Sequence, residues 1–247
     1  MPASSVEDDA LSPAGGGYPS SVGRDDWFRG PDWDVASQQN FEERLKRARD
    51  DNRPQYLRIK AVGLLASADP IARDGGVTLL QRVIDEHPNN WMHAPFTHEL
   101  LGRGFLIRGD RGRAKEHFRA AVETASPTRS GTSGGLADLA LVELLVEDGE
   151  LDEAVRRWDD VNSPDIPLAS TRKAMPLVEF QYSRAEAKLR FALGDRQAAA
   201  TAARTALTAA SATQSGLRWH RDLMSVPADE PGLRALRVLA EAADENH

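Results

Sequence analysis

The chain of 247 residues contains no cysteine, which excludes a disulfide framework, a thiolate zinc site and a cysteine nucleophile. Aromatic residues make up only 6% of the chain. No window approaches the run of about 18 apolar residues that a membrane-spanning helix needs. The first residues, MPASSVEDDA, lack the basic and apolar regions of a secretory signal. We therefore expect a cytoplasmic protein that does not act at a membrane.

Lysine is scarce, with 5 residues against 26 arginines, and this bias, together with abundant alanine, suggests GC-rich bacterial coding. The formal net charge is −7. Most of it lies in residues 1–40, which hold seven acids and two arginines. The rest of the chain is nearly neutral. Since a nucleic-acid partner requires a basic face, we expect none.

Composition divides the chain into residues 1–34 and residues 35–247. The first region contains SPAGGGYPSSVG, which has too little apolar surface to offset the entropy of ordering the chain, so we predict a disordered acidic tail. Its last part, DDWFRGPDWD, carries Trp27, Phe28 and Trp33 among four aspartates. These rings either fold back and cap the first helices or occupy the protein's own binding groove in competition with a ligand.

Apolar residues at helical spacing predict helices through the rest of the chain. Asp34 is expected to cap a first helix whose buried face carries Phe41 and Leu45. Pro54 is expected to open a second helix, and Pro88 to end a third. No stretch alternates with a period of two for long enough to be a strand. The sequence therefore predicts an all-α protein.

A glycine followed by an acid occurs three times at similar spacing. Gly109, Gly149 and Gly194 are 40 and 45 residues apart, and an alanine stands five residues after each, at Ala114, Ala154 and Ala199. This spacing is typical of repeated helix hairpins. Glycine at the turn permits a left-handed backbone conformation. We read the glycines as turning and packing positions, since GRGFLIRG lacks the preceding strand and the Gly-Lys-Ser/Thr of a phosphate loop.

The region around Gly109 resembles the tetratricopeptide repeat family. The match comprises Leu101, Gly102, Phe105, Gly109, Ala114, Phe118 and Ala121. His98 stands where the family often has Trp, and the repeats around Gly149, around Gly194 and in residues 53–88 match more loosely.

The resemblance implies a right-handed α-solenoid of antiparallel helix hairpins over residues 35–247. Gly102 and Ala114 would be small because the two helices of a hairpin approach closely there. A final helix, opened by Asp229 or Glu230 with Pro231, would cap the stack. An irregular helical bundle is the alternative fold.

In this family the first helices of the hairpins line a concave recognition groove. The residues that resemble groove positions are Phe96, Glu99, Arg103, Leu106, Leu139, Glu143, Arg184, Lys188 and Phe191. Arg184 and Lys188 lie four apart on one helix face and can hold a carboxylate. The resemblance implies a non-enzymatic scaffold that binds a protein or peptide segment, with no catalytic residue, cofactor or metal.

Two other functions compete with this one. His93, His98 and Glu99 are close together in HAPFTHEL and would serve a metal-dependent hydrolase or transferase. Against this, Gly102 stands where the second histidine of a His-Glu-x-x-His site belongs. The third possibility is a structural subunit of a larger assembly.

Overall fold

The computed structural model describes residues 26–88, 94–125, 136–163, 172, 175–212, 226, 230 and 232–241. These residues form ten α-helices and one short 3₁₀ helix, with no strand among them. The helices are α1 (Val35–Arg47), η1 (Asp50–Asn52), α2 (Arg53–Leu65), α3 (Pro70–Glu86), α4 (Ala94–Ile107), α5 (Arg111–Thr124), α6 (Leu136–Glu147), α7 (Leu151–Val161), α9 (Pro176–Ala192), α10 (Arg196–Ala210) and α11 (Leu233–Glu241). The prediction of an all-α protein is confirmed for this part of the chain.

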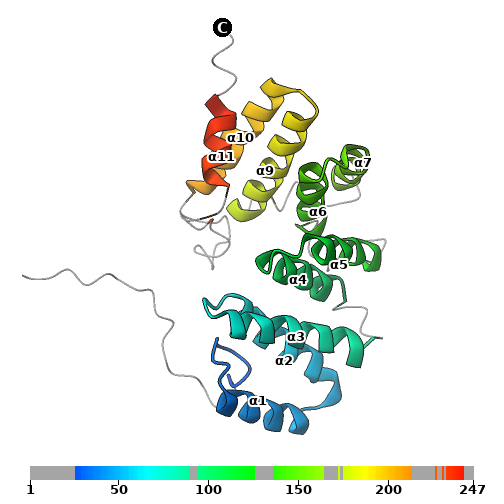
Figure 1. Ribbon diagram of the computed structural model, residues 1–247, viewed down its shortest axis with the longest axis vertical. Coiled ribbons are helices and arrows are strands. Elements are labelled where there is room, and N and C mark those ends of the chain that lie inside the picture. Colours follow the sequence, from blue (N-terminus) through cyan, green and yellow to red (C-terminus); the bar gives the residue numbers. More distant parts are fainter. Residues whose placement is uncertain are drawn as a thin grey trace, which may run out of the picture.

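The helices form an elongated stack of hairpins (Figure 1). Helices α2 and α3, α4 and α5, α6 and α7, and α9 and α10 pair with their neighbours in sequence. Successive hairpins touch through α3 and α4, α5 and α6, and α6 and α9. Helix α1 lies at one end of the stack and α11, which packs on α10 and α9, at the other. Along the described chain, no helix is long and apolar enough to cross a bilayer.

Local sequence signals set the ends of the first helices. The Asp34 carboxylate accepts a hydrogen bond from the Ser37 backbone N–H at 2.7 Å and caps α1, as predicted. Phe41 and Leu45 of α1 are both buried. Pro54 lies in the first turn of α2, and α3 ends at Glu86, shortly before Pro88. The expected starts and stops are therefore confirmed.

The three repeated glycines occupy identical turns. Gly109, Gly149 and Gly194 have φ angles of 76°, 77° and 86°, so the left-handed conformation expected at Gly109 is confirmed and recurs in the other two. In each turn the following residue donates its backbone N–H to a carbonyl five positions earlier: Asp110 to Phe105, Glu150 to Leu145 and Asp195 to Arg190. These bonds satisfy free carbonyls at the helix end. The side chains of Asp110 and Asp195 then cap α5 and α10.

Small residues mark close contacts inside the hairpins. A Cβ atom at Gly102 would lie 2.7 Å from the ring of Phe118 on α5. Ala114, Ala154 and Ala199 are all buried. The expectation that Gly102 is small because α4 and α5 approach closely is confirmed, and the group that requires the space is the Phe118 ring.

Residues 26–34, here called the aromatic segment, pack on the first helices. We expected a disordered tail over residues 1–34 whose three aromatic rings either fold back on the first helices or occupy the groove. In the structure the three rings have partners on α1 and α2. Trp27 lies 5.3 Å from Phe41 of α1, and Phe28 lies 4.6 Å from Tyr56 of α2, between ring centroids. Trp33 lies 6.0 Å from Phe41. Residues 1–25 fall outside the described part of the chain.

Helices α2 and α3 are shaped to receive the aromatic segment. A Cβ at Gly75 would lie 2.0 Å from the indole nitrogen of Trp33, and one at Gly63 would lie 3.0 Å from the carbonyl oxygen of Gly30. The Lys60 ammonium, only 3% exposed, donates to the carbonyl oxygens of Gly30 at 3.2 Å and Asp32 at 2.9 Å. Burial lowers the pKa of Lys60, and the charge of Asp32 partly opposes this.

The C-terminal end of the stack has a core of its own. Leu236 and Ala240 of α11 are buried with Phe180 of α9 and Ala206 of α10. Helix α11 begins at Leu233. Asp229 and Pro231, which we expected to open this helix, lie outside the described residues, whereas the Glu230 carboxylate binds Arg184 at 2.6 Å.

Candidate functional site

The predicted groove residues lie on the first helices of three hairpins. Phe96 and Phe191 are 37% and 49% exposed, and Leu106 is half-buried. Leu139 is 1% exposed and belongs to the core. Its assignment as a partner-binding residue is therefore wrong, because its face of α6 is covered within the stack. Glu99 is also buried, at 2% exposed.

The Glu99 carboxylate accepts hydrogen bonds from a residue of its own helix, α4. Arg103 Nε and Nη2 both donate to Glu99 Oε1, at 3.0 and 2.9 Å. Glu99 Oε2 is buried and has no hydrogen-bond partner among the described residues. Because the Arg103 guanidinium is already bound to an acid of the same chain, it offers less attraction to an outside carboxylate than an unpaired arginine does.

Arg184 and Lys188 do hold a carboxylate, and it belongs to this protein. Arg184 Nε donates to Glu143 Oε1 at 2.8 Å, and Lys188 Nζ donates to Glu143 Oε2 at 2.7 Å. Lys188 also bonds Glu147 at 2.7 Å. Burial alone would lower the pKa of Lys188, but the charges and hydrogen bonds of Glu143 and Glu147 outweigh it and raise the pKa. Glu143, expected to face a partner, instead joins α6 to α9.

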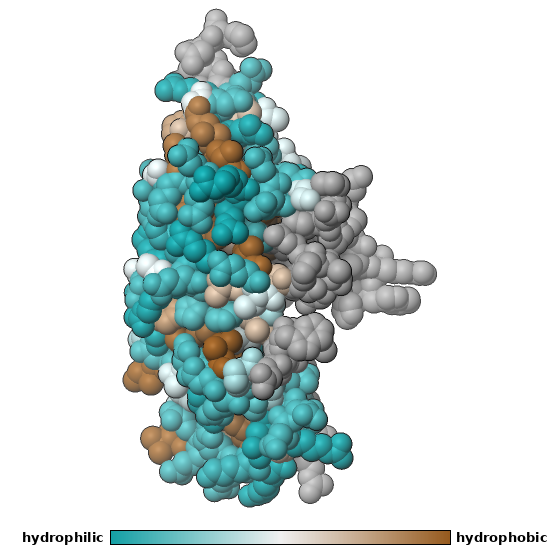
Figure 2. All heavy atoms as spheres, turned by 90° about the vertical axis from the view of Figure 1, so that its right-hand side faces the viewer, coloured by the Kyte–Doolittle hydropathy of each residue, from teal (hydrophilic) through white to brown (hydrophobic). Residues whose placement is uncertain are grey.

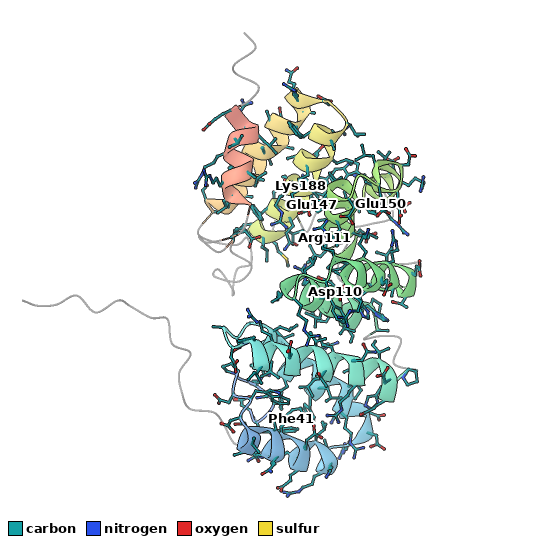
Figure 3. The ribbon with its side chains drawn as sticks, viewed as in Figure 1. Phe41, Asp110, Arg111, Glu147, Glu150 and Lys188 are labelled. Atoms are coloured by element: carbon teal, nitrogen blue, oxygen red, sulfur yellow. The ribbon has the colours of Figure 1, made fainter. Side chains whose placement is uncertain are left out.

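These contacts continue into an ionic network that links α5, α6, α7 and α9 (Figure 3). Three cations one turn apart on α5 bind acids around the α6–α7 turn: Arg111 binds Glu147 and Asp148 at 2.7 Å each, Lys115 binds Asp148 at 2.6 Å, and Arg119 binds Glu153 at 2.9 Å. Glu147 connects the ion pairs of α5 with those of α9, because it binds both Arg111 and Lys188.

The pKa of Glu147 reflects this position. Burial alone would raise it, but the hydrogen bonds from Lys188 and Arg111 outweigh burial and hold the pKa below its ordinary value. The spacing of Arg111, Lys115 and Arg119 along one helix face was a sequence signal for this cationic stripe. The acidic partners of Arg111, Glu147 and Asp148, lie 36 and 37 positions away and had no such signal.

His98 packs as an aromatic residue, as its position in the repeat suggests. Its Nδ1 lies 3.1 Å from His117 Nδ1 on α5, and the His117 ring stacks on Phe105 with centroids 5.2 Å apart. Burial, and secondarily the charge of His117, lowers the pKa of His98 from 6.5 to about 4. The imidazole is therefore neutral at neutral pH.

The alternative metal site gains no support from this geometry. His98 faces His117 while Glu99 binds Arg103, so the two side chains do not converge. His93, the third proposed ligand, lies outside the described residues. Within the described ranges, no group of three or more His, Asp or Glu side chains is arranged to hold a metal ion.

An open apolar hollow lies between α9 and α11, and the sequence did not lead us to expect it. This hollow, here called the C-terminal hollow, has a volume of about 660 Å³. It is lined by Phe191, Gly232, Arg234, Ala235, Val238 and Leu239. Only Phe191 was among the predicted groove residues. The face toward the right of Figure 1, where α5 and α7 lie, is mainly hydrophilic with apolar residues in separate areas (Figure 2).

No family model, curated protein or solved structure matches this chain. The resemblance to tetratricopeptide repeats therefore rests on the residues of the repeats themselves.

Proposed function

We propose that this protein is a non-enzymatic scaffold of tetratricopeptide-like hairpins in a right-handed solenoid, which binds a peptide or protein segment along α4, α6 and α9. The observation that carries the proposal is the exposure of large apolar side chains on α4 and α9. Phe96 on α4 and Phe191 on α9 both expose more than a third of their surface. Exposed aromatic residues on a rigid support are typical anchors of protein recognition.

Two positions recur between hairpins and support a repeated binding surface. Leu106 and Phe191 each stand three residues before a turn glycine, Gly109 and Gly194. The equivalent turns place both side chains at the same point of their helices. The ionic network holds neighbouring hairpins together, so that these apolar groups keep a fixed spacing and less order must be imposed when a partner binds.

The cations of this surface have a supporting role. Arg103, Arg184 and Lys188 are each bound to carboxylates of the chain itself. Apolar contacts, rather than charge pairing at these three residues, would therefore supply most of the affinity for a partner.

Site-specific photo-cross-linking tests the proposal. A photoreactive phenylalanine analogue at position 96 is expected to form adducts with a defined set of cellular proteins, because more than a third of the Phe96 surface is exposed. The control is the same analogue at position 156, where Arg156 is exposed on α7, the second helix of its hairpin. Equal adduct patterns at the two positions would contradict a specific surface on the first helices.

A further inference from the structure

The C-terminal hollow combines apolar lining with high exposure. Phe191 of α9 is 49% exposed and Val238 of α11 is 61% exposed, and both line the hollow with Leu239. Gly232, with a φ of 98°, also lines the hollow, and a Cβ atom there would lie 3.8 Å from Arg184 Cδ. Its volume of about 660 Å³ is within the range of small-ligand and side-chain pockets, about 300–1,000 Å³.

The charges around the hollow differ from those at α6. Arg234 lines the hollow and is exposed, and Arg237 is exposed one turn further along α11. Within the described part of the chain, neither arginine forms an ion pair, whereas Arg184 and Lys188 are neutralised by Glu143. The nearby Glu230 carboxylate is bound to Arg184. The hollow is thus an apolar surface beside cations that are open to an outside acid.

We propose that the C-terminal hollow binds a peptide segment in which a large apolar side chain is adjacent to acidic residues. The apolar side chain lies against Phe191, Val238 and Leu239, and an acidic neighbour pairs with the Arg234 guanidinium. Arginine suits this role because its planar donors bind a carboxylate through two hydrogen bonds. A short peptide fits better than a second folded copy, since six lining residues are few beside the 20–30 per side of a stable interface.

This inference rests on the proposed function and makes it more specific. It places the anchoring contact at the α9–α11 end of the first-helix surface and gives the partner a negative charge. The predicted carboxylate recognition by Arg184 and Lys188 is replaced by recognition at Arg234.

The test uses the full chain and an array of ten-residue peptides with a central Leu, Phe or Trp. In one arm aspartates flank the apolar residue, in the second arm lysines do, and in the third serines do. The unaltered protein is expected to bind the aspartate arm best, with affinity that falls as salt is added. Binding of the lysine arm equal to or stronger than that of the aspartate arm, or no binding of any aspartate peptide, would overturn the inference.

Variants at exposed positions locate the contact. Arg234→Glu is expected to weaken the best aspartate peptide by at least about tenfold and to improve lysine peptides. Val238→Asp is expected to abolish binding of the aspartate arm, and Arg156→Glu on α7 is the matched control that leaves it unchanged. Circular dichroism and urea unfolding verify that each variant is folded.

A fourth variant separates this inference from the proposed function. Phe96→Asp on α4 is expected to leave the aspartate arm bound, because α4 is remote from α11 in the stack. If Phe96→Asp removes binding and Val238→Asp does not, the scaffold function stands and the hollow is not the anchor. If both variants bind normally, the hollow is refuted, and cross-linking from position 96 then decides the scaffold function by itself.

Discussion

A methyl group added at Gly75 should destabilise the protein because Trp33 occupies the space beside it. The added Cβ would lie 2.0 Å from the indole nitrogen of Trp33, and 2.6 Å from two further ring atoms. Atoms at that distance overlap, so the indole ring or α3 must move. An added methyl in a well-packed site costs about 1–3 kcal/mol. Alanine in a helix interior returns about 1 kcal/mol relative to glycine.

The net expectation for Gly75→Ala is a loss of up to roughly 2 kcal/mol in the free energy of unfolding. Gly112→Ala on α5 is the matched control, since the nearest group to its Cβ is an Asp110 oxygen at 3.8 Å. That change meets no obstruction and should stabilise the protein by about 0.5 kcal/mol. Gly75→Ala should therefore be the less stable of the two glycine-to-alanine variants, by about 1–2 kcal/mol.

Urea unfolding followed by far-UV circular dichroism gives these free energies. The cost of Gly75→Ala should largely disappear when Trp33 is also changed to alanine, because the obstructing ring is then absent. Equal stability of Gly75→Ala and Gly112→Ala would contradict this packing, and so would a cost of Gly75→Ala that is the same with and without Trp33. Either result would mean that the aromatic segment does not pack on α3 in solution.

Three further predictions concern the hairpins. The pKa of His98 is lowered from 6.5 to about 4 in the folded protein. Between these two pH values the unfolded chain binds more protons than the folded chain, so the free energy of unfolding should fall as the pH falls. After reduction for the partial exposure of His98, its share of the loss is about 1–2 kcal/mol. His98→Phe should remove this share and leave that of His117, whose pKa is also lowered by burial and by the charge of Arg113. An unchanged difference between unfolding at about pH 7 and about pH 4.5 would contradict this. Glu147→Gln should cost less than about 1 kcal/mol and reduce the salt dependence of stability, relative to Glu43→Gln in the exposed helical pair with Arg47. Equal salt dependence in both variants argues against a connected network. Gly109→Ala should cost about 1 kcal/mol because of its φ of 76°, measured by urea unfolding beside Gly112→Ala, and no loss would show that the turn is not left-handed.

Helical periodicity and repeat spacing predicted only part of the candidate site. The sequence pointed to the first helices and to Phe96 and Phe191, which are exposed as a binding surface requires. It also placed Leu139 and Glu143 there by counting from Gly149, although Leu139 is buried and Glu143 binds Arg184 and Lys188. Counting within a repeat fixes a position along a helix. It does not say whether the next hairpin covers that position.

The helices and their turns could be predicted from the sequence alone, because they depend on residues that are neighbours in the chain. Asp34 caps the helix that follows it, and glycine at positions 109, 149 and 194 permits the left-handed turn wherever the rest of the chain lies. Which helix faces meet could be seen only in the packed fold. Trp33 lies against Gly75, and Phe191 and Val238 share one hollow, because packing joins residues that are distant in sequence and leaves no local pattern of its own.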